Sequence, residues 1–174
     1  FNYYPANGSM KLGETILFLD IDPDSPDYGS TRSASFQARS GAGQYICSNW
    51  ISIAPRNGSP LRPGTTYAVV MTDGIADEDG NPLTKDDDFT AMLDSDEPSD
   101  SALANAWKAY APLRDYLDND DLERAVSYSN ISAAAVFTTG NPRGKIERIR
   151  ASVREQAPPR ISDVRTDDSD ALFT

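Results

Sequence analysis

The stretch LRPGTTYAVVMTDGIADEDGNPL, residues 61–83, decides the fold that we predict for this chain of 174 residues. It opens with a proline-glycine turn at Pro63 and Gly64 and continues into an apolar run over 67–72. That run is apolar on both faces, which is typical of a central strand. We therefore predict a central strand that the chain enters through a sharp turn.

Four residues at the start of this stretch, Leu61, Pro63, Gly64 and Tyr67, have the spacing of a tyrosine corner. A loop that crosses between two sheets leaves backbone groups that neither sheet satisfies. In a tyrosine corner, the ring is buried and the hydroxyl bonds to the backbone of that loop. Leu61 is expected to close the end of the core, and Gly80 to take a positive φ in the next turn.

Short runs elsewhere in the chain predict further strands. The runs at 14–21 and 33–39 precede the decisive stretch, and the second alternates apolar and polar residues. A third run at 44–53 is expected to be interrupted near Asn49. The β-prone run at 133–139 ends at a glycine, and we predict that it pairs with 67–72.

The pattern between residues 84 and 130 is mostly helical. Apolar residues recur at helical spacing from Leu103, and Pro112 must kink or restart this helix. Asp120 stands three residues before Glu123, a capping-box spacing that predicts a second helix.

The stretch resembles the bacterial Ig-like domains of secreted and cell-envelope proteins. In that family, an L-x-P-x-T-x-Y corner and a G-I/V-x-D-x-x-G-N-P-L turn precede a closing strand that ends in Phe-Thr-Thr. Residues 74–83 match the turn, but Phe-Thr-Thr appears only at 137–139. The resemblance implies a mainly β fold with added helices, an Ig-like antiparallel β-sandwich over 1–140 with a helical insertion at about 84–130 before the last strand.

Two further points concern domain organisation. In a rival placement, 88–93 (DFTAML) is the closing strand and the helices form a separate appendage.

After the sandwich, an Asn-Pro pair opens a C-terminal helix over 141–156, and 157–174 is expected to be a linker or a flexible tail. Because the chain starts without methionine, we expect a fragment or a processed product.

The composition excludes several functions. With 27 acidic and 16 basic residues the net charge is −11, which disfavours nucleic acid and anionic lipid as partners. No apolar run is long enough for membrane insertion. The chain has no histidine, so Ser-His-Asp and Cys-His catalysis are excluded. Cys47, its single cysteine, has apolar neighbours and is expected to be a buried, inert thiol.

Four aspartates in the loop after the first strand form a candidate metal site. Asp20, Asp22, Asp24 and Asp27 offer hard oxygen ligands at mostly alternate spacing, which suits calcium. The loop lacks the glycine and the glutamate of an EF-hand, and an acidic turn closed by its own backbone bonds is the alternative. A calcium-dependent rise in melting temperature would distinguish the two.

From these observations we expect a non-catalytic module of a secreted or cell-envelope protein that has no cofactor, with calcium at the aspartates as the one candidate ligand. Its partners would be other domains of the same polypeptide or a surface partner. Two alternatives stay open. One is a carbohydrate- or protein-binding module that uses calcium, and the other is an accessory domain of a larger secreted hydrolase, because similar domains in some proteins precede a hydrolase.

Overall fold

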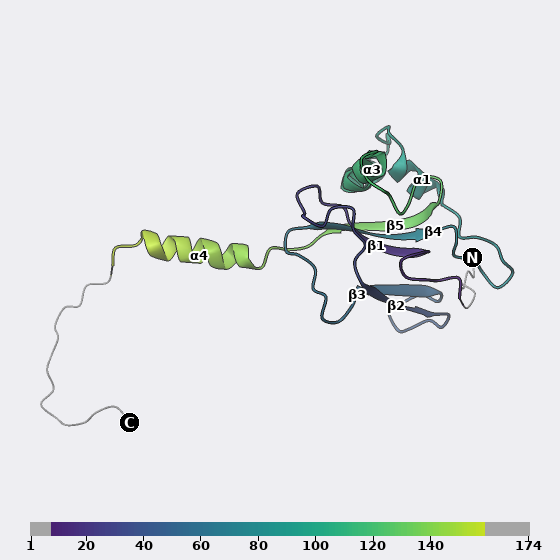
Figure 1. Ribbon diagram of the computed structural model, residues 1–174, viewed down its shortest axis with the longest axis horizontal. Coiled ribbons are helices and arrows are strands. Elements are labelled where there is room, and N and C mark those ends of the chain that lie inside the picture. The colour runs from purple at the N-terminus through teal and green to yellow at the C-terminus, as the bar shows by residue number, and fades with distance from the viewer. Residues whose placement is uncertain (1–7, 159–174) are drawn as a thin grey trace, which may run out of the picture. The chain divides into compact units, whose positions relative to one another are not determined.

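The computed structural model describes residues 8–158, which belong to two compact units (Figure 1). Unit 1 ends at Gly140 and unit 2 begins at Asn141. Unit 1 is a mixed α/β domain with two antiparallel sheets. In the described residues no helix is both long and apolar enough to cross a membrane.

A three-stranded sheet forms the centre of unit 1. Its strands are β1 (Ile16–Asp20), β4 (Thr66–Thr72) and β5 (Ile131–Thr138), in the order β1-β4-β5. Ile16 lies opposite Met71 in the first pair. The pairing of β5 with β4 confirms the predicted partnership between 133–139 and 67–72.

The second sheet has two strands, β2 (Ala34–Arg39) and β3 (Trp50–Pro55). The predicted strand at 44–53 begins only at Trp50, because Asn49 takes a positive φ of 58° that ends extended structure on its N-terminal side. Cys47 precedes this residue and is exposed, so the prediction of a buried thiol is wrong. Its apolar neighbours Tyr45 and Ile46 are exposed as well.

Three helices follow β4 in the chain and precede β5: α1 (Asp87–Leu93), α2 (Ser101–Ala109) and α3 (Ala111–Asp118). Helix α1 occupies the segment of the rival closing strand, so that placement is wrong. The reason is local: the Asp86 carboxylate accepts the Phe89 N–H at 2.6 Å as an N-cap, and the buried residues Phe89, Met92 and Leu93 recur at helical spacing.

The start of α3 agrees with the sequence prediction, whereas the segment after α3 does not. Pro112 lies in the first turn of α3, two residues after Tyr110, the residue that separates α3 from α2. The helix expected from Asp120 does not form. Residues 119–130 take an irregular path instead. In that path Leu122 and Val126 still pack on the core, so tertiary contacts rather than the capping-box spacing decide the backbone.

The core lies between the three-stranded sheet and the helices (Figure 1). Alternate strand residues face the helical layer, as the period-2 geometry of a strand requires. The buried core residues on the strands are Leu17, Leu19, Ala68, Val70 and Ile131, and the helices supply Phe89, Met92, Leu93, Leu113, Tyr116 and Leu117.

A buried arginine joins the three helices. Arg114 on α3 is only 7% exposed, and its guanidinium stacks 3.9 Å from the centre of the Trp107 ring. Its Nη1 donates hydrogen bonds to the carbonyls of Met92 (2.7 Å) and Trp107 (2.9 Å). These carbonyls lie near the C-terminal ends of α1 and α2, where the helix dipole favours a cation.

Unit 2 contains α4 (Arg143–Glu155), within the predicted 141–156. The Asn141 side chain accepts the N–H groups of Arg143 (3.1 Å) and Gly144 (3.2 Å), so it caps the helix from the expected position. Most of the predicted linker at 157–174 lies outside the described residues.

Replacing Arg114 with methionine tests its role in the helical layer. The variant removes the Arg114 donor from both carbonyls, of which the Trp107 carbonyl keeps the Tyr110 N–H, and it removes the stacking on Trp107. We expect the free energy of unfolding in urea to fall by about 1–3 kcal/mol. Arg124→Met is the matched control, because Arg124 pairs with the exposed Asp120 and should cost no more than about 1 kcal/mol. Equal losses in both variants would contradict the assignment.

Candidate functional site

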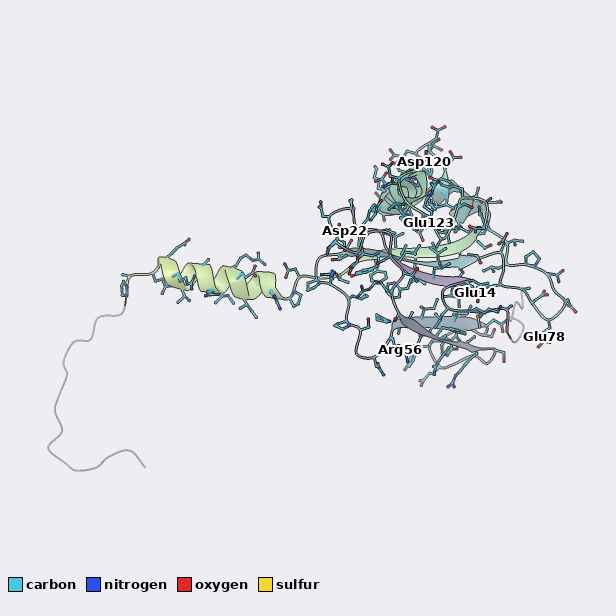
Figure 2. The ribbon with its side chains drawn as sticks, in the orientation of Figure 1. Glu14, Asp22, Arg56, Glu78, Asp120 and Glu123 are labelled. Carbon is cyan, nitrogen blue, oxygen red and sulfur yellow. The ribbon has the colours of Figure 1, made fainter. Side chains whose placement is uncertain are left out.

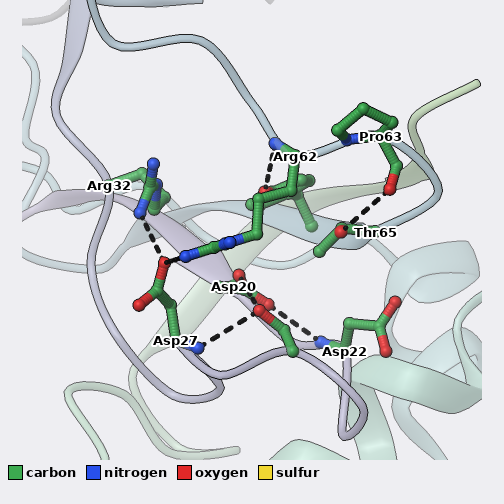
Figure 3. A network of polar contacts seen from close by, with 9 residues as sticks. Asp20, Asp22, Asp27, Arg32, Arg62, Pro63 and Thr65 are labelled. Carbon is green, nitrogen blue, oxygen red and sulfur yellow. Dashed lines mark hydrogen bonds and ion pairs between the residues drawn. The ribbon is translucent and has the colours of Figure 1, made fainter.

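Two stretches singled out in the sequence meet at one end of unit 1 (Figure 3). One is the acidic loop, residues 20–32, which follows β1. The other is the corner, residues 61–67, which leads into β4. Together they line a cavity of about 360 Å³, whose wall residues are Asp22, Asp24, Ser25, Pro26, Arg62, Pro63, Gly64 and Thr65.

The corner has the hydrogen bond that its sequence pattern predicts. Tyr67 is fully buried, and its hydroxyl accepts the backbone N–H of Arg62 at 3.0 Å. The ring meets Phe18 of β1 edge to face, with 5.7 Å between ring centres. Gly64 takes a positive φ of 68°, which lets the chain turn sharply, and Leu61 is half-buried beside it.

The turn at Gly80 lies apart from this site and is stabilised locally. Gly80 has the expected positive φ, 83°. Asp77 accepts the N–H groups of Asp79 (3.0 Å) and Asn81 (2.8 Å) and the Asn81 side-chain amide. These bonds lower the pKa of Asp77 below its ordinary value. The aspartates of this turn therefore hold its backbone in shape.

In the acidic loop, two carboxylates accept hydrogen bonds from the protein itself. Asp20 is completely buried and accepts the Ser25 hydroxyl at 2.7 Å. Asp22 accepts the N–H of Asp24 with one oxygen and the N–H of Thr66 with the other, both at 3.0 Å. Because Thr66 is the first residue of β4, Asp22 ties the loop to the corner.

The third carboxylate, Asp27, receives two arginines on one oxygen (Figure 3). Arg62 approaches Oδ2 with Nη2 at 2.8 Å and Nε at 3.1 Å, and Arg32 with Nη1 at 3.1 Å. The hydrogen bond from Arg62, reinforced by both positive charges, lowers the pKa of Asp27. This cluster links the acidic loop to the corner by charge.

The four aspartates do not converge on one point. Among residues 8–158 no three acidic or cysteine side chains are grouped as a metal site would need. Asp24 is exposed, whereas Asp20, Asp22 and Asp27 are engaged as described. Binding calcium here would require these hydrogen bonds to be exchanged for metal ligation. Calcium binding by these residues stays a prediction.

The chain leaves unit 1 at the same corner. The last residue before Gly140, Thr139, exchanges backbone hydrogen bonds with the corner: its N–H donates to Thr65 (3.0 Å) and its carbonyl accepts from Gly64 (3.1 Å). Its hydroxyl donates to the Arg62 carbonyl at 2.5 Å and accepts the Thr65 N–H at 3.0 Å. We call this set of bonds the exit clamp.

Sequence reasoning did not single out Arg62, Arg32 or Thr139 as members of this site. Thr139 is the last residue of the Phe-Thr-Thr pattern at 137–139, and that pattern could have identified it. Arg62 stood inside the corner pattern at a position that the pattern leaves open, so nothing marked it.

Several polar side chains of the cavity wall are held by hydrogen bonds within the protein. Its serine, Ser25, donates its hydroxyl proton to the buried Asp20, and the chain has no histidine to activate it. Asp22 accepts backbone N–H groups and Arg62 pairs with Asp27, whereas the Asp24 side chain is exposed. Comparisons with protein-family models, curated proteins and solved structures each found no match to this chain.

The Asp27 cluster makes a prediction about acid stability. Because the pKa of Asp27 is lower in the folded chain than in the unfolded chain, its stabilising effect is present above the unfolded pKa of about 4 and is lost as pH falls through the folded pKa. We expect Asp27→Asn to flatten the decline of the free energy of unfolding over that acid range. Urea unfolding at a series of pH values measures the slope.

Arg62→Gln is the matching control for this experiment. It removes the main partner of Asp27 and should flatten the same slope, with little further change when it is combined with Asp27→Asn. An unchanged slope in Asp27→Asn would show that the ion pair contributes nothing to acid sensitivity.

Proposed function

We propose that this chain is a non-catalytic Ig-like module of a secreted or surface bacterial protein and serves as a spacer or scaffold between domains. The observation that carries the proposal is the exit clamp. Thr139 is bonded through its backbone and its side chain to the corner, just before the chain passes into unit 2. A spacer needs a fixed point of departure for the chain, and this arrangement supplies one.

The path of the chain supports the Ig-like assignment. β3 belongs to the two-stranded sheet and β4 to the three-stranded sheet, so residues 56–65 connect one sheet to the other. A tyrosine that closes such a connection is a feature of Ig-like sandwiches. The chain order, with helices α1–α3 after β4 and before β5, supports the proposal of an Ig-like domain that carries a helical insertion.

The distribution of acidic side chains supports a module whose surface is in contact with solvent. Acidic side chains project from different parts of unit 1, including Glu78 in the second turn and Asp120 and Glu123 beside the helices (Figure 2). A negative surface of this kind keeps a module soluble and repels phosphate backbones. The partners that fit the proposal are other domains of the same polypeptide or a protein on the cell surface.

Cell fractionation tests the proposal. The organism that encodes the chain is separated into medium, envelope and cytoplasm, and the protein is detected with an antibody raised against the purified chain. We expect the signal in the medium or the envelope, and a cytoplasmic enzyme serves as the marker for lysis. A signal that follows only the cytoplasmic marker would rule the proposal out.

A further inference from the structure

Helix α4 carries an apolar stripe that is largely exposed. Ile146, Ile149 and Val153 recur three and four residues apart, so they lie on one face of the helix. Their exposed fractions are 67%, 65% and 62%. Contiguous apolar side chains at such exposure mark a surface that binds a partner.

A row of arginines runs along one side of this stripe. Arg143, Arg150 and Arg154 are seven and four residues apart, and Arg150 stands one turn from Ile146. In the part of the chain that the structure describes, none of the three arginines forms an ion pair. The surface that complements α4 is therefore apolar with carboxylates at its rim.

Two copies of α4 do not complement each other. The helix contains five basic and two acidic residues, a net charge of +3, and Lys145 stands on the other side of the stripe. Two helices packed stripe to stripe, parallel or antiparallel, would place cations opposite cations. Residues 8–140 contain 21 acidic and 9 basic residues, a net charge of −12, so they complement α4 in charge.

A groove of about 330 Å³ in unit 1 has the required chemistry. Its apolar lining comes from α1, α2 and β5, chiefly Phe89, Met92, Leu103, Ala106, Ala133 and Ala134. Asp86 and Asp88 line it as well, and both are exposed. Apolar side chains and carboxylates therefore occur together in this groove.

We propose that α4 of one copy of the chain binds in this groove of a second copy. The apolar stripe enters the groove, and the arginine row pairs with Asp86 and Asp88. Amphipathic helices bind apolar grooves through residues at i, i+3 and i+7, which is the spacing of Ile146, Ile149 and Val153. Because the second copy keeps its own α4 for a third, the contact is head-to-tail and joins copies into chains or closed rings. This assembly goes beyond the spacer role, which needs no self-association.

Sedimentation equilibrium of the full chain over a range of concentrations tests the proposal. The mean mass should rise with concentration, and it should rise less at high ionic strength because arginine–aspartate pairs are screened. Ile149→Asp should keep the mass of a single chain. Ala151→Asp is the matched control and should associate like the parent. It adds the same charge on the opposite face of α4 and lowers helix propensity at least as much.

A mixture of two variants tests the head-to-tail contact. Ala106→Arg fills the groove and leaves α4 intact, so alone it should keep the mass of a single chain. Mixed with Ile149→Asp, it should form a complex with one chain of each variant, because one supplies the helix and the other the groove. Circular dichroism and urea unfolding that match the parent show that each variant is folded.

A parent that keeps the mass of a single chain at every concentration would overturn the proposal. Self-association of Ala106→Arg would overturn it as well, because copies would then join without the groove. The same holds for a mixture that forms no complex, and for a loss of association in Ala151→Asp equal to that in Ile149→Asp.

Discussion

The fold of unit 1 depends on satisfying the backbone where the chain crosses from the smaller sheet to the larger one. The hydroxyl of Tyr67 accepts the Arg62 N–H at that crossing, and the same ring packs against Phe18 inside the domain. One side chain therefore fixes both the loop and the first apolar layer behind it. Because a backbone donor that loses its partner costs free energy, this acceptor stabilises the crossing.

The polar groups around the corner extend this principle to neighbouring segments. Asp22 holds the first N–H of β4, Asp27 holds the guanidinium of Arg62, and Thr139 is bonded to the same turn. The acidic loop also reaches the helical layer, where Tyr28 meets Tyr116 edge to face. Four segments therefore meet at this end of the domain: the acidic loop, the corner, the end of β5 with Thr139, and α3. Such a junction suits the proposed role of a module that is followed in the chain by a second unit.

Local patterns in the sequence predicted those features whose causes are local. The strand at 67–72 and its corner depend on neighbouring residues, and a β-prone run was enough to propose the partner at 133–139. A short apolar run such as DFTAML does not distinguish strand from helix by periodicity alone, so the rival strand at 88–93 was wrong. The helix expected at Asp120 failed because contacts with the core determine that path.

The candidate site was harder to predict because its contacts are distant in the chain. Asp22 bonds to a residue 44 positions away, and Asp27 to one 35 positions away. Spacing within the loop suggested metal ligands, but it carried no information about Arg62. A single sequence identifies the carboxylates, whereas only the fold identifies the donors that face them.

The most direct measurement of the central claim is a double-mutant cycle in urea with Tyr67→Phe and Thr139→Val. Tyr67→Phe removes one hydrogen bond from the corner, so the free energy of unfolding should fall by about 1 kcal/mol, while Tyr45→Phe, at a residue that is 90% exposed, should have no effect. The two corner substitutions should be coupled, because both act on residues 62–65. A Tyr67→Phe variant as stable as the parent, with effects that simply add, would contradict the account.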